Sequence, residues 1–505
     1  MLTTHKMFEE IFKIADDGIP EFKTYFNGTW AFDDRFLDIK SPIDGKIIAR
    51  IPQLSEDKIT TAIEAAYTKG KEEIRSYPGE KRVSNFLKAA ELMKEAFEDF
   101  VNVLILDTGK PRQKNAEGEV KATIERLERT TMESTRLIGE FIPGDWSDET
   151  LETQGIVKRE PFGVVLTIGP FNYPLFIPAT KIIPALLVGN AIILKPASVA
   201  PLAPLMFTRI LELAGFPKHS FTTLTLRGSD TNMLVQSGKI CAISFTGSTQ
   251  IGAEIIRNAG IKAFHLELGG KDPAIVLNDS DLGTTVNKLV KGIVSYSGQR
   301  CDAIRLILVE KQVHDQVKSM LIDQLMNISP KNPLEDTSAI MGPVIDEKSA
   351  LFIEEVYNDA IDKGAKPLLK LKRTRNYVWP LLLEVTKSIL PTLKAFQEDV
   401  FGPLTLMLKV QDEDEAIEIA NSSKFGLDAS IFGQDGSRIR KIARKLQVGA
   451  VFINEYPRHG IGYYPFGGMK QSGIGREGIG YSTWQLTTTK TIVHNFKGYG
   501  VWEYL

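Results

Sequence analysis

One cysteine of this chain stands in a setting that suits nucleophilic chemistry. Cys301 is one of two cysteines among 505 residues and lies in the segment Tyr296-Ser297-Gly298-Gln299-Arg300-Cys301-Asp302. The thiolate is the nucleophilic form of cysteine, and a neighbouring cation such as Arg300 favours it. A lone cysteine is also commonly a small buried apolar residue, so Cys301 alone leaves both interpretations open. Cys241, at the start of the apolar run 241–245, is predicted to be a buried strand residue.

A carboxylate and an amide stand at two further positions that suit catalysis. Glu267 lies between apolar residues in His265-Leu266-Glu267-Leu268-Gly269-Gly270. Apolar surroundings disfavour the ionised form, so we expect its pKa to rise toward the range of a general base. A buried ion pair is the equally weighted alternative. Asn172, in Pro170-Phe171-Asn172-Tyr173-Pro174, is either a turn asparagine or an amide donor to an oxyanion.

Two further segments suit the binding of an anionic ligand. The segment 245–252 follows a predicted strand and begins a helix, so Gly247 permits close approach and the helix offers free N–H groups near Ser248. Lys195 ends the apolar run 191–194 and places a cation at the end of a strand. A purely structural turn and a solvated lysine are the alternatives that each segment leaves open.

Bulk composition excludes several classes of protein. The formal net charge of −2, from 61 basic and 63 acidic residues, gives no electrostatic reason to expect a nucleic acid or membrane partner. Two cysteines cannot build a disulfide framework, and no Cys/His cluster has metal-ligand spacing, so we expect no metal site. The first 20 residues lack the apolar core of a signal peptide. These observations predict a cytoplasmic protein of two or three domains.

The elements that must position these residues are predicted from apolar runs. Continuous Val/Ile/Leu runs that alternate with helical stretches indicate a parallel sheet covered on both faces. Ligands bind beyond the carboxyl ends of such strands, which here carry polar residues or glycines and predict a single cleft. The runs are 163–168, 191–194, 221–226, 242–245 and 264–268, and the residues at their ends include Asn172, Lys195, Gly228, Gly247, Ser248 and Glu267.

Patterns outside this region predict the remaining architecture. A β segment near 25–51 precedes two amphipathic helices over 82–100 and 117–137. A polar connection over 141–155 is expected to protrude, and a second α/β segment begins near Asp272, with a strand over 304–309. The tail 487–493 alternates polar and apolar residues, which predicts a half-exposed strand whose edge pairs with another subunit.

The order and spacing of these motifs resemble the aldehyde dehydrogenase superfamily over nearly the whole chain. The matching segments are 170–174, 195–198, 245–249, 266–271, 298–301 and 401–403. The resemblance implies an α/β fold with a doubly wound parallel-sheet cofactor domain, an α/β catalytic domain and a small β bridging domain. It places the dinucleotide-binding domain at 1–140 and 162–273, the catalytic domain at 274–480, and the oligomerisation domain at 141–161 and 481–505. A homodimer or homotetramer is implied.

The resemblance also implies roles for the residues of the reaction. Cys301 attacks an aldehyde carbonyl, Asn172 stabilises the oxyanion, and Glu267 activates the water that hydrolyses the thioester. Glu477 is a second acid that joins proton transfer. The implied cofactor residues are Lys195 at the adenosine ribose, Ser248 at the pyrophosphate, Phe401 near the nicotinamide, and Ser198, Gly228, Gly247 and Asp399. Serine at 198 replaces a glutamate common in NAD-preferring relatives, which predicts NADP use with NAD also possible. Asp399 replaces the usual glutamate at the nicotinamide ribose.

Cationic residues near the substrate entrance predict an anionic aldehyde. Arg300, Arg458 and Tyr173 map there, and planar guanidinium groups hold phosphate or carboxylate through paired hydrogen bonds. Arg126 or Arg129 adds a further contact, and the helix register leaves that choice open. This set resembles the non-phosphorylating glyceraldehyde-3-phosphate dehydrogenases and implies irreversible oxidation of D-glyceraldehyde 3-phosphate to 3-phosphoglycerate. A dehydrogenase of a carboxylated semialdehyde such as succinate semialdehyde is the alternative.

Overall fold

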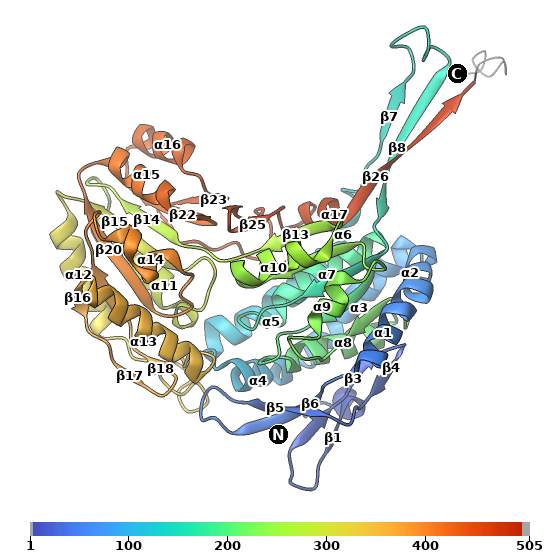
Figure 1. The fold of residues 1–505 in the computed structure, drawn as a ribbon, viewed down its shortest axis with the longest axis horizontal. Coiled ribbons are helices and arrows are strands. Elements are labelled where there is room, and N and C mark those ends of the chain that lie inside the picture. The colour runs from blue at the N-terminus through green and yellow to red at the C-terminus, as the bar shows by residue number, and fades with distance from the viewer. Residues whose placement is uncertain (1–3, 497–505) are drawn as a thin grey trace.

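The computed structural model describes residues 4–496. Two large sheets and several smaller ones organise this part of the chain (Figure 1). The termini of the predicted domains, at 1–3 and 497–505, lie outside the described residues. The domain boundaries remain a prediction.

The five apolar runs form neighbouring parallel strands at the centre of an eight-stranded sheet. Its order is β25-β13-β12-β9-β10-β11-β3-β4, and the five strands β9 to β13 are all fully or largely buried. Because they are parallel, their carboxyl ends share one edge of the sheet. The run 221–226 is shorter than predicted. The bounds are β9 Val164–Ile168, β10 Ala191–Lys195, β11 Phe221–Thr223, β12 Ala242–Thr246, β13 Ala263–Glu267, β25 Gly473–Ile474, β3 Thr24–Phe26 and β4 Thr29–Ala31.

Helices cover both faces of this sheet, and two of the predicted helices are broken. The stretch predicted as one helix over 82–100 is divided at Ala96, where the backbone leaves helical geometry. The stretch 117–137 is likewise divided at Arg129. The bounds are α1 Glu56–Ala65, α2 Lys71–Ser76, α3 Gly79–Glu95, α4 Phe97–Thr108, α5 Glu117–Glu128, α6 Thr130–Ser134, α7 Phe176–Val188, α8 Leu202–Ala214, α9 Thr231–Gln236 and α10 Thr249–Ala259.

A second sheet of seven strands follows, in the order β16-β19-β20-β15-β14-β22-β23. The predicted strand 304–309 is β15 at its centre. The strands are β14 Asp272–Val276, β15 Ile304–Glu310, β16 Lys366–Leu369, β19 Leu381–Glu384, β20 Leu404–Val410, β22 Asp428–Phe432 and β23 Ala450–Ile453. The helices are α11 Leu282–Val294, α12 His314–Met326, α13 Glu347–Asp362, α14 Lys394–Gln397, α15 Glu413–Ser422 and α16 Gly436–Lys445.

A three-stranded antiparallel sheet extends away from the rest of the molecule (Figure 1). It contains β7 Glu140–Pro143, β8 Thr153–Pro161 and β26 Thr487–Asn495, so the predicted protruding connection and the predicted tail strand belong to one arm. Large apolar side chains stand exposed on it, Trp146 at 79% and Val493 at 63%. The hydrophobic effect makes such a surface a favourable interface.

Short elements connect these sheets. β1 Phe12–Ile14, β2 Pro20–Phe22, β5 Phe36–Lys40 and β6 Ile47–Pro52 form a four-stranded sheet, so the β segment predicted near 25–51 is shared between two sheets. β25 comes from late in the chain and pairs antiparallel with β13, which closes that edge of the first sheet. α17 Tyr481–Gln485 leads into β26. No helix among residues 4–496 has the length and apolar character needed to cross a membrane.

Candidate active site

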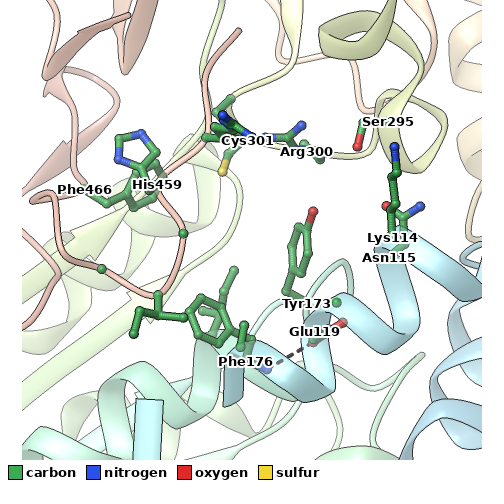
Figure 2. Close-up of a pocket in the computed structure, with 18 of the residues that line it drawn as sticks. Lys114, Asn115, Glu119, Tyr173, Phe176, Ser295, Arg300, Cys301, His459 and Phe466 are labelled. Carbon is green, nitrogen blue, oxygen red and sulfur yellow. Dashed lines mark hydrogen bonds and ion pairs between the residues drawn. The ribbon is translucent and has the colours of Figure 1, made fainter. Parts of the chain in front are cut away.

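Cys301 lies on the wall of a cavity of about 580 Å³ that both halves of the chain line. In Figure 2, Cys301 and Arg300 stand opposite Phe176 and Glu119, while Lys114 and Asn115 lie across the cavity from His459 and Phe466. Tyr173 directs its hydroxyl into the open space between them. The cavity therefore brings the thiol, aromatic rings and cationic side chains to one place.

A strained turn carries Cys301 to the cavity. Tyr296 and Ser297 have φ angles of 48° and 55°, in the left-handed region that non-glycine residues rarely adopt. Ser297 Oγ donates to the Gly342 carbonyl at 2.8 Å, which helps to hold this conformation. A Cβ at Gly298 would meet the Gly402 carbonyl oxygen at 2.3 Å, so only glycine fits there. The left-handed backbone at Tyr296 and Ser297 and the glycine at 298 therefore together place Cys301 at the cavity.

The Cys301 thiol is held in its protonated form. Burial raises its pKa well above the usual value, and the carboxylates of Asp302, Asp272 and Asp428 raise it further. Arg300 acts in the opposite direction, but its Nη2 atom is paired with Asp302 at 2.6 Å. Arg300 thus favours the thiolate, as its place beside Cys301 predicts, but burial and the three carboxylates outweigh it. The expectation for Cys241 is wrong, because that residue precedes β12 and is half-buried.

Asn172 is buried beside the cysteine motif. Its side-chain Nδ2 atom donates to the backbone carbonyl of Gln299 at 3.0 Å. The backbone carbonyl of Asn172 accepts from Lys110 Nζ at 2.8 Å. An amide nitrogen has two hydrogens, so one remains for another acceptor. Lys110 forms a fully buried ion pair with Glu119. Neither Lys110 nor Glu119 was predicted from the sequence, because only their contact in space distinguishes them.

Glu119 fixes the start of the helix that follows Asn172. Its Oε1 atom accepts from the backbone N–H groups of Leu175 at 2.9 Å and Phe176 at 3.0 Å, and Figure 2 marks the second contact. These are orphan donors at the first turn of α7, which an acidic side chain satisfies well. The segment 170–174 is thereby held between the sheet and the cysteine motif.

Glu267 ends β13 and is 1% exposed. Burial raises its pKa well above the usual value, as its apolar flanks predict, and the neighbouring Glu477 adds to the shift. Its Oε1 atom lies 3.2 Å from His265 Nε2, whereas Oε2 has no hydrogen-bond partner among the described residues. Glu267 is not part of the cavity wall that contains Cys301.

Glu477 does line that cavity and lies close to Glu267. One ligand atom from each of His265, Glu267 and Glu477 falls within 4.8 Å of the others. Burial raises the pKa of Glu477, but Lys181 and His265 oppose it and bring the pKa below the usual value. Lys181 Nζ lies 3.4 Å from Glu477 Oε2. Lys181 was not predicted from the sequence. The available signal was a single lysine within the otherwise apolar helix α7, which indicates a buried charge with a partner.

The predicted cofactor residues lie along the shared edge of the first sheet. Lys195 is buried at the end of β10, and its Nζ atom lies 3.5 Å from Ser198 Oγ. Among residues 4–496, no carboxylate pairs with it. Burial alone lowers its pKa. Ser248 caps α10, with its Oγ atom accepting from the Ile251 N–H at 3.3 Å. Gly228, in the turn before α9, has open space where a Cβ would lie.

Asp399 and Phe401 reach this edge from the second half of the chain. Asp399 Oδ1 lies 3.3 Å from Arg305 Nε, and burial raises the Asp399 pKa despite that cation. A Cβ at Gly269 would meet Asp399 Oδ2 at 2.6 Å, and one at Gly247 would meet the ring of Phe245. Phe401 packs edge-on against Phe171 at 6.0 Å. Arg305, which the sequence did not single out, thus supports Asp399.

The predicted substrate residues are only partly brought together. Arg126 lines the cavity, but its Nη2 atom is 2.6 Å from Glu133 Oε1 in a buried ion pair. Arg129 does not line the cavity, because it stands at the break after α5, near Glu125 and the Tyr463 ring. The helix register thus favours Arg126. Arg458 lines the cavity but is 61% exposed and pairs with Glu455 at 3.0 Å.

Two lysines on the cavity wall were missed. Lys114 precedes α5 and Lys291 lies one turn before the end of α11. Both are exposed, and within residues 4–496 neither forms an ion pair. Their charge therefore remains available to an anionic ligand. Exposed lysines are common in any sequence, so only their place beside the cavity distinguishes them.

Comparisons with known proteins agree with this arrangement. The NADP-dependent glyceraldehyde-3-phosphate dehydrogenase of Streptococcus equinus is 35% identical over 94% of this chain and 98% of its own length. The lactaldehyde dehydrogenase of Methanocaldococcus jannaschii is 35% identical over 93% of this chain and 99% of its own. The structure of NADP-dependent glyceraldehyde-3-phosphate dehydrogenase from Bacillus halodurans, complexed with NADP, matches with a TM-score of 0.89 and 37% identity over 94% of this chain and 99% of that chain.

The family model described as "Aldehyde dehydrogenase family" matches residues 30–492, which includes every residue of the candidate site. That match spans most of the chain, and both relatives cover nearly its full length. The chain therefore belongs to the aldehyde dehydrogenase family and is an oxidoreductase that acts on aldehydes.

Proposed function

We propose that the protein oxidises D-glyceraldehyde 3-phosphate to 3-phosphoglycerate with NADP, through a thioester on Cys301 that water hydrolyses. The supporting observation is the charge of the cavity wall beside the thiol, where Lys114 and Lys291 have no ion-pair partner among the described residues and Arg458 is exposed. Cationic side chains around one cavity favour a phosphorylated aldehyde over a neutral one. The named function of the Streptococcus equinus relative agrees.

The residues at the shared edge of the first sheet fit NADP. Lys195 is a buried cation without a carboxylate partner in the described part of the chain, and an unpaired buried charge is costly unless an anion compensates for it. Ser198 beside it carries no charge that would repel a phosphate on the ribose. Ser248 at the start of α10 would hold the pyrophosphate, and Asp399 the nicotinamide ribose. When bound, the nicotinamide supplies the acceptor for the hydride.

The protein's own groups perform the remaining steps. The Cys301 sulfur adds to the aldehyde carbonyl as its S–H proton passes to the carboxylate of Glu477 on the same cavity wall. The oxygen of the thiohemiacetal accepts hydrogen bonds from Asn172 Nδ2 and the Cys301 backbone N–H. After oxidation to the thioester, Glu267 takes a proton from water while the water oxygen bonds to the carbonyl carbon. The carbon–sulfur bond then breaks, and the acid leaves. Glu477, which lines the cavity and is held by Lys181, exchanges protons with this site.

A substrate panel tests this proposal. Purified protein is assayed with D-glyceraldehyde 3-phosphate, lactaldehyde, succinate semialdehyde and propanal, each with NADP⁺ and with NAD⁺ and without inorganic phosphate. We expect the highest kcat/KM for glyceraldehyde 3-phosphate with NADP⁺. A higher value for succinate semialdehyde would favour the carboxylated alternative, and one for lactaldehyde would favour the function named for the Methanocaldococcus jannaschii relative.

Variants at the cavity wall test the charge argument. Because hydrogen bonds to a charged group contribute about 1.5–3 kcal/mol, Lys291→Ala and Arg458→Ala should each raise KM for glyceraldehyde 3-phosphate by about tenfold or more. The KM for propanal should remain unchanged. Lys121→Ala, on the exposed face of α5 and outside the cavity wall, is the matched control. Equal effects on both aldehydes would argue against a phosphate site here.

The arm supports a proposal about assembly. We propose that β7, β8 and β26 pair with other copies of the chain to form a homodimer or homotetramer. The exposed apolar side chains of Phe141, Trp146 and Val493 support it. These segments belong to the proposed oligomerisation domain, 141–161 and 481–505, of which 497–505 lies outside the described residues.

A further inference from the structure

His265 lies next to Glu267 on the same face of β13. Side chains two residues apart on a strand point to the same face, which brings His265 Nε2 within 3.2 Å of Glu267 Oε1. On the other side of the ring, His265 Nδ1 lies 3.1 Å from Ser244 Oγ. Ser244 is the register partner of His265 on β12, so the sheet itself sets this spacing. All three side chains are buried.

The imidazole is neutral in these surroundings. Burial lowers the pKa of His265 to about 3, and Lys181 and Arg476 act in the same direction, while Glu477 opposes them. A neutral imidazole has one N–H donor and one acceptor nitrogen, and the partner of each nitrogen sets the tautomer. His265 can therefore satisfy both forms of Glu267. It accepts at Nε2 from the protonated carboxyl, or donates from Nε2 to the carboxylate while Ser244 donates to Nδ1.

The other charged groups near Glu267 bind other partners and do not hydrogen-bond to Glu267 Oε1. Lys181 is engaged with Glu477, and Arg476 Nη1 donates to the carbonyls of Gly468 and Gly475. Asp428, which also acts on Glu267, accepts from His459. Within residues 4–496, His265 is thus the one side chain that hydrogen-bonds to Glu267. Oε2 is left free.

We propose that His265, supported by Ser244, is a positioning residue for Glu267: it holds Oε1 so that Oε2 is the atom that removes the proton from the hydrolytic water. This rests on the proposed role of Glu267 as the base. In the step, the water O–H bond breaks and its proton goes to Oε2, the water oxygen bonds to the thioester carbon, and the carbon–sulfur bond breaks to release the Cys301 thiolate. His265 itself never contacts the substrate.

An acyl-transfer assay without cofactor isolates this step. 4-Nitrophenyl acetate acetylates Cys301 and releases 4-nitrophenolate in a burst, after which hydrolysis of the acetyl thioester limits the steady rate. The variants are His265→Phe, which keeps a ring without hydrogen bonds, His265→Gln, which restores a donor and an acceptor, and Ser244→Ala. Thr222→Val, a buried polar residue of β11 away from Glu267, is the control.

We expect the His265→Phe burst to keep its amplitude while the steady rate falls by about tenfold, a fraction of what a general base contributes. His265→Gln should recover part of the rate. Ser244→Ala should shift the pH at which the steady rate is half-maximal without altering the burst. Steady rates of all three variants within twofold of the parent would overturn the proposal, and so would a burst rate that falls as much as the steady rate.

The Glu267→Gln variant separates this inference from the proposed function. If Glu267→Gln hydrolyses the acetyl thioester as fast as the parent, Glu267 is not the base and the proposed mechanism fails with the inference. If Glu267→Gln is slow and the His265 variants are normal, only the inference fails. Should His265→Phe not fold, His265→Gln and Ser244→Ala carry the same comparison, since both make small changes in volume.

Discussion

Arg300 Nη2 lies 2.6 Å from Asp302 Oδ2, so the two neighbours of Cys301 in the sequence neutralise each other in space. The same nitrogen donates to the Pro457 carbonyl at 2.8 Å. A cation that already has an acid partner does little to stabilise a nearby thiolate, whereas the surrounding carboxylates disfavour it. The net effect of these groups is a pKa of the Cys301 thiol above its usual value.

Asp302→Asn should make Cys301 more reactive. The carboxylate of Asp302 raises the pKa of the thiol, so its removal lowers that pKa and increases the thiolate fraction at pH 7. We expect the rate of alkylation by iodoacetamide at pH 7 to rise several-fold and its pH midpoint to fall. Asp323→Asn, on the exposed side of α12, is the control. An unchanged midpoint would mean that Asp302 does not control the thiol.

Ser198→Glu should reverse the proposed preference for NADP. A carboxylate beside Lys195 would pair with that lysine and repel a phosphate on the ribose. Like charges placed together cost several kcal/mol, so we expect kcat/KM for NADP⁺ to fall by about a hundredfold, with little change for NAD⁺. Ser388→Glu, at an exposed position of the second half, controls for added charge. Comparable losses with both cofactors would place Ser198 away from the ribose.

His265 should also make the protein sensitive to acid. Its folded-state pKa of about 3 is below the unfolded value near 6.5. The unfolded chain therefore binds a proton that the folded chain does not, so this group's contribution to stability is complete above about pH 6.5 and is lost as pH falls toward 3. The difference in Tm between pH 7.5 and pH 5 should be smaller in His265→Gln than in the parent. An equal difference in both proteins would contradict the buried neutral imidazole.

Charge on the arm should disrupt the proposed assembly. Phe141→Asp places a carboxylate on the exposed apolar face of β7, and an unpaired charge in a buried interface is unfavourable. Light scattering after size-exclusion chromatography should report a smaller assembly than the parent. Ile261→Asp is the control, because Ile261 is also apolar and is fully exposed in the turn before β13. It should leave the mass of the assembly unchanged. If Phe141→Asp keeps the parent's mass, another surface forms the oligomer.

The sequence predicts most of the first sheet because its strands are buried on both faces. Continuous apolar runs such as 191–194 admit few alternatives, and they recur as parallel strands with the predicted glycines and polar residues at their ends. The helices were less predictable. The breaks at Ala96 and Arg129 follow tertiary packing, and neither residue is a helix breaker.

The candidate site was predictable where a motif is continuous in the sequence. Cys301, Asn172 and Glu267 each lie in a short segment with distinctive neighbours. Lys110, Lys181 and Arg305 were missed because each meets its partner only after folding. The raised pKa of the Cys301 thiol was also not predicted. Asp272 and Asp428 contribute to it, and they are far from Cys301 in the chain but near it in space.

The antiparallel pairing of β25 with β13 has a consequence for synthesis on the ribosome. The strand that carries Glu267 is an open edge until residues 473–474 emerge. With about 200 residues still to be translated at ~5–20 residues per second, that edge waits roughly 10–40 s for its partner. The nascent chain thus leaves one edge of β13 unpaired while β12 holds the other, which makes this edge a natural place for a chaperone to act and for synonymous codon changes to alter yield.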